Sequence, residues 1–196
     1  MAMKKHTKAA AMPQNCITAS QQALRDTWRS LWEQHVEWTR MTILSAVFNL
    51  PNLADTTARL LQNPADMAAA LRPVYGDAAS NQFAQLIRTH LLIATRLVAA
   101  AKSGDTAAAA QAEREWYANG AEVAAAVASI NPYISQNAFQ DKFFRHLALT
   151  KAEAVLMLAG DYRGSIATYD QIEREALMMA DMISDGVIRQ HPELFA

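Results

Sequence analysis

The sequence predicts an all-α protein, an up-and-down helical bundle of about six helices built from three pseudo-repeated helical hairpins. Apolar residues recur with a period near 3.6, and no segment alternates with the period of two that is typical of strands. A weak internal repeat also returns a histidine on an apolar helix face at positions 35, 90 and 146, which are 55 and 56 residues apart. A repeat of this length indicates a helical hairpin that must stack on its neighbours to bury its apolar face.

The first hairpin is expected to differ from the other two. Its first helix carries two adjacent apolar stripes, which predict a wide buried face, and it is expected to end at Pro51. Asp55 or Thr56 can cap the next segment. Pro64 suits the first turn of a short helix that is expected to stop before Pro73. An irregular second arm of this kind is typical of a terminal unit that caps a stack.

Four longer helices are expected to follow, because the residues at their ends are good caps or helix breakers. Their expected spans are Asp77 to Lys102, Asp105 to Asn131, Ser135 to Gly160 and Asp161 to Pro192. The loops between these helices are short, so successive helices should be antiparallel neighbours.

The length and the cysteine content favour one domain in a reducing compartment. The chain has 196 residues, and we expect a mobile tail at 1–17 followed by a single helical domain at 18–196. The only cysteine, Cys16, excludes an internal disulfide and a cysteine-cluster metal site. No apolar segment suits a signal peptide, so the expected localisation is cytoplasmic.

The charge pattern argues against two classes of partner. The chain has 18 Lys and Arg against 19 Asp and Glu, a net charge of −1, and neither sign collects into a run. A nucleic-acid binder would show a basic stripe, and a binder of anionic membranes would show a basic amphipathic helix. We therefore expect no nucleic-acid and no membrane partner, while a homo-oligomer is left open.

The repeated histidines are the first candidates for chemistry. If the hairpins are related by an approximate rotation, equivalent inward positions lie at similar heights and can converge on one point. Glu173, placed in the apolar stripe of the last helix, is the carboxylate expected to join His35, His90 and His146. Imidazoles with a carboxylate would suit a divalent metal such as zinc, iron or manganese. The other carboxylates considered are Asp66, Glu122 and Asp181, which are related by the repeat, and the weaker Glu33 and Glu153.

Several other functions lack their required motifs. Di-iron bundles use Glu-x-x-His on two helices, and this chain has no such sequence, so a mononuclear site is the metal site that remains. No Walker loop, GxGxxG pattern or GxSxG elbow is present. The sequence therefore indicates no catalytic residue.

Five stretches carry a resemblance that runs from about Leu24 to Ile188. They are Trp32 to Leu44, Arg59 to Asp66, Trp116 to Asn119, Ile130 to Tyr133 and His146 to Thr150. In these stretches the chain resembles a family of uncharacterised all-helical bacterial proteins, some of which carry the label acetylglutamate kinase or glutamate kinase. The resemblance implies a bacterial origin and a helical fold. Amino-acid kinases have an α/β sheet with glycine-rich phosphate loops, so the resemblance implies no catalytic residue here.

Two hypotheses from different classes follow from the sequence. In the first, the bundle encloses a site for a metal or a small polar ligand, built from the three histidines and Glu173. In the second, the bundle is structural or binds a partner protein, and each histidine is a core residue with a local hydrogen bond. Whether the histidines converge on a shared space distinguishes the two.

Overall fold

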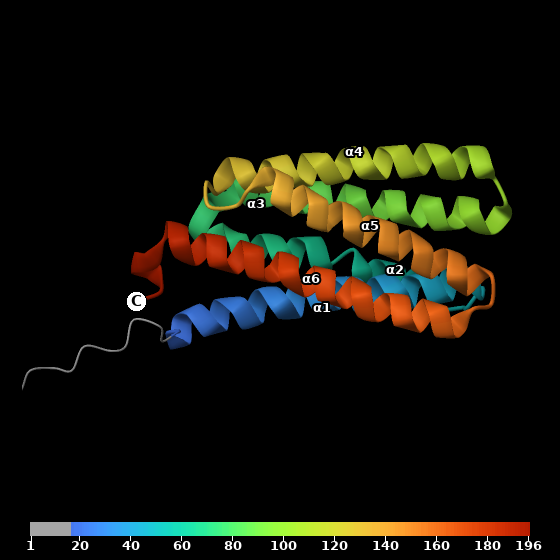
Figure 1. The fold of residues 1–196 in the computed structure, drawn as a ribbon, viewed down its shortest axis with the longest axis horizontal. Helices are drawn as coiled ribbons and strands as arrows, with labels where there is room; N and C mark the ends of the chain where they lie inside the picture. Colours follow the sequence, from blue (N-terminus) through green and yellow to red (C-terminus); the bar gives the residue numbers. More distant parts are fainter. Residues whose placement is uncertain (1–16) are drawn as a thin grey trace, which may run out of the picture.

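The computed structural model describes residues 17–196, so the expected N-terminal tail, apart from its last residue, and Cys16 lie outside the described part of the chain. Within that part there are six α-helices, one short 3₁₀ helix and no strand, which confirms the predicted all-α class (Figure 1). The elements are α1 (Ala19–Val47), α2 (Leu53–Leu60), α3 (Asn63–Ser103), α4 (Thr106–Ile130), α5 (Gln136–Leu158), α6 (Tyr162–Gln190) and η1 (Pro192–Leu194).

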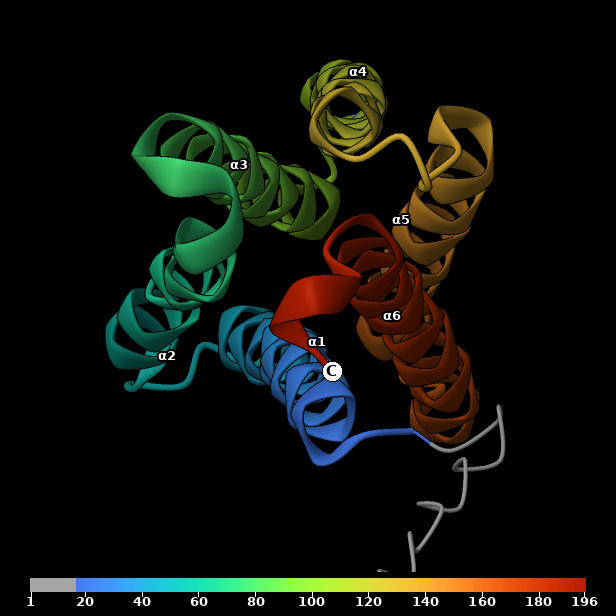
Figure 2. The ribbon, with the colours of Figure 1, turned by 90° about the vertical axis from the view of Figure 1, so that its left-hand side faces the viewer.

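The helices form three antiparallel hairpins whose long axes run along the bundle (Figure 1). In the first hairpin α1 packs against α2 and the first part of α3; in the second the rest of α3 packs against α4; in the third α5 packs against α6. The hairpins close on one another, because α4 packs against α5 and α6 packs against α1 (Figure 2). The three first arms, α1, α3 and α5, also contact one another, so their inward faces share one interior.

The boundary inside α3 lies three residues later than the sequence predicts. The expected stop before Pro73 is wrong: the helix continues through Pro73, and the backbone breaks at Gly76, with φ 73° and ψ −178°. Only glycine adopts this combination of angles readily. Leu71 is buried and Tyr75 packs against the core. We infer that this packing offsets the hydrogen bond that Pro73 cannot donate.

The connection from α1 to α2 also differs in detail from the expectation. The first helix ends at Val47, before Pro51, and Asn49 has a φ of 52° in the turn. Neither Asp55 nor Thr56 caps α2, because the helix already begins after Asn52. The expected caps of the later helices are confirmed. The side chains of Asp105, Ser135 and Asp161 each accept a hydrogen bond from a backbone N–H of the first turn of α4, α5 and α6.

Large aromatic side chains fill one part of the shared interior. Trp28, Trp32, Trp116, Phe139 and Phe143 are each at most 1% exposed and belong to one continuous core. Gly186 of α6 permits a close approach at the edge of this core, since a Cβ atom there would lie 2.6 Å from Cγ1 of Ile134. Over the described residues, none of the helices has the length and apolar character required to cross a membrane.

A buried ion pair joins α1 to α5. Arg40 Nη1 donates to Oε1 of Glu153 and to Oγ of Ser165, and the Glu153 side chain is only 2% exposed. Burial raises the pKa of Glu153, and the nearby charge and hydrogen bond of Arg40 lower it. Burial has the larger effect, so the pKa is raised to about 7.

We predict that Glu153 makes the stability of the protein depend on pH. Its pKa is raised in the folded state, so the folded protein binds this proton more tightly than the unfolded chain does. The carboxyl should therefore lower the stability of the fold as the pH rises from 4.5, the ordinary pKa of a glutamate, to about 7, its pKa in the folded protein. The difference in unfolding free energy between wild type and Glu153→Gln should fall by on the order of 2–3 kcal/mol between pH 5 and 8 in urea titrations.

The substitution Glu122→Gln, at an exposed position of α4, controls for the loss of one negative charge. A difference between wild type and Glu153→Gln that stays constant across this pH range would contradict the prediction.

Candidate metal centre

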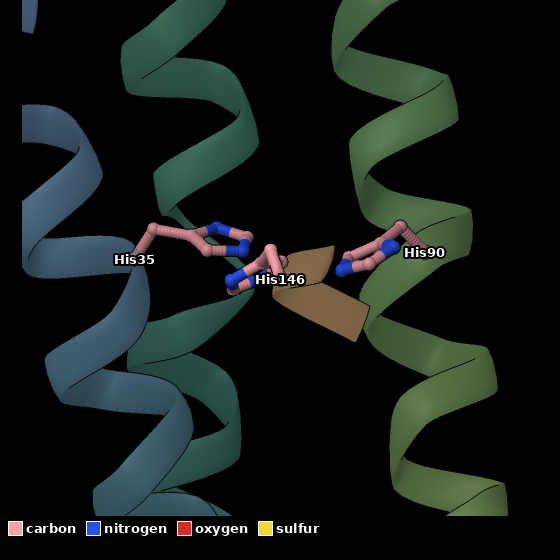
Figure 3. A group of neighbouring side chains, drawn as sticks. All are labelled: His35, His90 and His146. Atoms are coloured by element: carbon pink, nitrogen blue, oxygen red, sulfur yellow. The ribbon is translucent and has the colours of Figure 1, made fainter. Parts of the chain in front are cut away.

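Three helices from the three hairpins bring the repeated histidines together. His35 lies on α1, His90 on α3 and His146 on α5, and each offers one ring nitrogen to a group whose atoms all lie within 4.8 Å of one another. Figure 3 shows the rings pointing toward a common centre from separate helices. The expected convergence of the histidines is therefore confirmed. We call these three side chains the histidine layer.

The histidine layer is enclosed by aromatic rings. Each histidine is 1% exposed. The edge of Trp32 meets His35 with ring centroids 5.3 Å apart, and Trp116 stacks on His90 at 5.2 Å. Water is therefore largely excluded from the imidazoles.

A buried asparagine fixes the orientation of His35. Nδ2 of Asn63 donates to the carbonyl of Leu31 at 2.9 Å, which aims the Asn63 Oδ1 atom at the ring. Nδ1 of His35 lies 3.0 Å from this oxygen. Because an amide oxygen only accepts, the proton of a neutral His35 is placed on Nδ1, and Nε2 keeps its lone pair. Support of this kind is typical of metal-binding histidines.

The second hairpin repeats this arrangement without the final hydrogen bond. Asn119 lies 56 residues after Asn63, and its Nδ2 donates to the carbonyl of Leu86, which precedes His90 by four residues, as Leu31 precedes His35. Oδ1 of Asn119 and Nδ1 of His90 are both buried, and neither has a hydrogen-bond partner among the described residues. The repeat therefore extends beyond the histidines to the two asparagines and to the backbone carbonyls that their Nδ2 atoms bind.

The third hairpin has a carboxylate at the equivalent position. Glu175 follows Asn119 by 56 residues and is 4% exposed. Its Oε1 lies 2.7 Å from Nε of Arg145, and its Oε2 lies 3.3 Å from Nζ of Lys142. Nδ1 of His146 is buried and makes no hydrogen bond within residues 17–196. Two of the three histidines thus have no local partner.

Burial keeps all three imidazoles neutral at pH 7. It lowers the pKa of His35 to about 4, against the opposing effect of the Asn63 hydrogen bond. It lowers the pKa of His146 to about 3, with a further contribution from His35, and lowers the pKa of His90 well below its usual value. A neutral imidazole has a free lone pair, which is the form that binds a metal ion.

The spacing of the nitrogens is close to that of a mononuclear site. Three atoms no more than 4.8 Å apart have a common centre within about 2.8 Å of each, compared with about 2.0–2.1 Å for a zinc–imidazole bond. Inward movements of less than about 1 Å would complete the coordination. Three protein ligands leave a further coordination position open.

Glu173 is not part of this group. It lies half-buried on α6 next to Tyr169, whose pKa it helps to raise. The inward face of α6 is taken by Ile172, Ala176 and Met179. The structure therefore does not bring Glu173 to the histidine layer.

The remaining carboxylates lie elsewhere too. Asp66, Glu122 and Glu33 are exposed, Asp181 pairs with Arg29, and Glu153 pairs with Arg40. Sequence reasoning missed Asn63 as the partner of His35, and missed Asn119 and Glu175 as its equivalents in the repeat. The repeat spacing of 56 residues was the available signal for all three.

Comparisons with known proteins give no further guide to the site. No protein-family model, curated protein or solved structure matches this chain. The functional assignment therefore depends on the geometry of the histidine layer.

We predict that Asn63 contributes more to stability than its repeat equivalent Asn119. Asn63→Ala removes two buried hydrogen bonds and Asn119→Ala removes one. Each buried hydrogen bond contributes about 1 kcal/mol, and a partner left unsatisfied adds to the loss. Urea unfolding of chelator-treated protein should give a loss of about 2–4 kcal/mol for Asn63→Ala and a smaller one for Asn119→Ala. Equal losses would contradict the assigned bond to His35.

Proposed function

We propose that this protein binds one divalent transition-metal ion through His35, His90 and His146. The observation that carries the proposal is the meeting of three neutral, buried imidazoles from three helices within 4.8 Å. A core histidine with a structural role needs only a local hydrogen bond, which two of these three lack in the described residues. A shared ion would use the lone pairs of all three at once.

The donor set favours a particular class of metal. Imidazole nitrogen suits zinc, copper, nickel and iron, whereas magnesium, calcium and manganese prefer oxygen ligands. The group contains no carboxylate, so a divalent ion would keep its positive charge within an apolar interior. An anion or hydroxide from solvent in the open position would offset that charge. When bound, the metal would supply Lewis acidity to a molecule in that position.

A structural bundle is the second candidate function. The Nδ1 atom of His35 has a local hydrogen bond, and stacking on Trp116 would also suit a core residue at position 90. In that case the histidines would contribute through packing alone, and no metal would bind. Metal binding separates the two candidates directly.

We predict that untagged protein binds one zinc ion per chain, measured by competition with a chromophoric chelator. Cobalt(II) at the same site should show the intense visible absorption bands of low coordination. Replacing any one of His35, His90 or His146 by glutamine should weaken zinc binding at least 100-fold, because only two of the three imidazole ligands would then remain. His191→Gln is the matched control, since His191 lies outside the group and pairs with Glu193.

The supporting evidence would be one equivalent of zinc whose affinity depends on each of the three histidines. Circular dichroism of each variant checks that the helices are intact. A folded wild-type protein that takes up no zinc, copper, nickel or iron would overturn the proposal in favour of the structural bundle. So would zinc binding that survives all three substitutions.

We also predict that Asn63 tunes the affinity of the site. Asn63→Ala should weaken zinc binding about 10–100-fold, because the His35 ring loses the partner that fixes its tautomer and orientation. The matched variant is Glu173→Gln, which removes the carboxylate that the sequence favoured and should change zinc affinity less than about twofold. A large effect of Glu173→Gln with no effect of Asn63→Ala would show that the ion binds elsewhere.

A further inference from the structure

A cavity of about 270 Å³ lies directly beside the histidine layer. Its walls come mainly from α1, α3, α4 and α5, and Leu60 of α2 adds to them. Thr39, Ala94 and Thr150, which each follow a histidine of the layer by four residues, belong to its lining. Trp116, which stacks on His90, also lines it. The cavity and the histidine layer therefore occupy consecutive levels of the same interior.

The sequence around each histidine explains why the interior is hollow on this side of the layer. Three residues before the histidines stand Trp32, Ile87 and Phe143, all 0% exposed, and their large side chains fill the bundle. Four residues after them the equivalent positions are small, two threonines and an alanine. Protein interiors are normally packed to the density of organic crystals, so a void of this size is a specific feature.

The lining restricts the charge of an occupant. The charged side chains in it are Glu113 and Lys151, and these pair with each other at 2.6 Å. The hydroxyl of Thr150 donates to the carbonyl of its own helix at His146. Thr42 also lines the cavity, and its hydroxyl is buried without a partner among the described residues. Nε1 of Trp116, another lining residue, is likewise buried without a partner among the described residues. An occupant should therefore be uncharged and largely apolar, with no more than two polar groups.

The volume restricts the size of an occupant. An apolar cavity of about 150 Å³ stays dry and binds benzene. On that scale a cavity of about 270 Å³ suits a molecule of two fused rings. Thr106, Ala110 and Val155 are exposed members of the lining, so the cavity has an opening to solvent.

We propose that this cavity binds an uncharged, largely apolar small molecule of about ten carbon atoms, with one end next to the histidine layer. The proposal does not depend on metal binding, because none of the three histidines lines the cavity. If the metal also binds, the occupant would lie beside the residues that hold it.

The test uses calorimetry on the full, metal-free chain with 2-naphthol as the probe and 2-naphthalenesulfonate as its charged analogue. Wild-type protein should bind one 2-naphthol and bind the sulfonate at least tenfold more weakly. Ala109→Phe places a ring in the cavity and should weaken 2-naphthol binding at least tenfold. The matched control is Ala118→Phe, an exposed position on the same helix outside the cavity, where binding should stay within twofold of wild type.

Ala94→Leu is a second, smaller filling variant, used if Ala109→Phe does not fold. Folded wild-type protein that shows no saturable binding of 2-naphthol would overturn the proposal. Undiminished binding to a folded filling variant would overturn it as well, and equal affinity for the sulfonate would refute an uncharged occupant. Zinc titration of the same samples keeps the two proposals separate, because either kind of binding can fail while the other persists.

Discussion

The arrangement of the interior depends on the register of the three hairpins, which places one imidazole from each at the same level of the bundle. On a helix, a shift of one residue turns a side chain by about 100°, so a slip in any hairpin would carry its histidine out of the shared interior. The register is held above the histidine layer by Trp32, Ile87 and Phe143, whose large side chains are completely buried. The ion pair of Arg40 with Glu153 ties α1 to α5 on the other side. Positions that are equivalent in the repeat thus become neighbours in space.

Much of the fold could be predicted from the sequence because each unit repeats the same local rules. Helical periodicity, the caps at Asp105, Ser135 and Asp161 and the short loops all favour antiparallel helices. The end of the first part of α3 could not be placed, since a proline is a local signal for a helix end and the packing of Leu71 and Tyr75 overrides it. Pro73 and Gly76 are both residues that can end a helix. Tertiary contacts, which a single sequence does not show, decide which of the two does so.

The candidate site was predicted in part for the same reason. The histidines occupy equivalent repeat positions, so their convergence followed from the repeat. Glu173 was assigned from one helix stripe alone, and it lies at the edge of the inward face, next to the buried Ile172. The residue at the repeat-equivalent position is Glu175. A repeat therefore locates a site more reliably than amphipathic periodicity, because it fixes position along and around the helix together.

The interior of the described bundle gives up stability at two adjacent levels, which supports the proposed binding role over a purely structural one. A buried polar atom without a hydrogen bond costs about 1–3 kcal/mol, and Nδ1 of His90 and Nδ1 of His146 are two such atoms in the described residues. The cavity beside them forfeits the dispersion contacts that larger side chains at positions 39, 94 and 150 would make. Leucines at the three histidine positions would remove the unpaired nitrogens, and leucines at positions 39, 94 and 150 would restore dispersion contacts. Both changes would give a more stable bundle. The sequence instead combines unpaired imidazoles with free volume at adjacent levels. This is the arrangement expected where stability is offset against room for an ion and a small molecule.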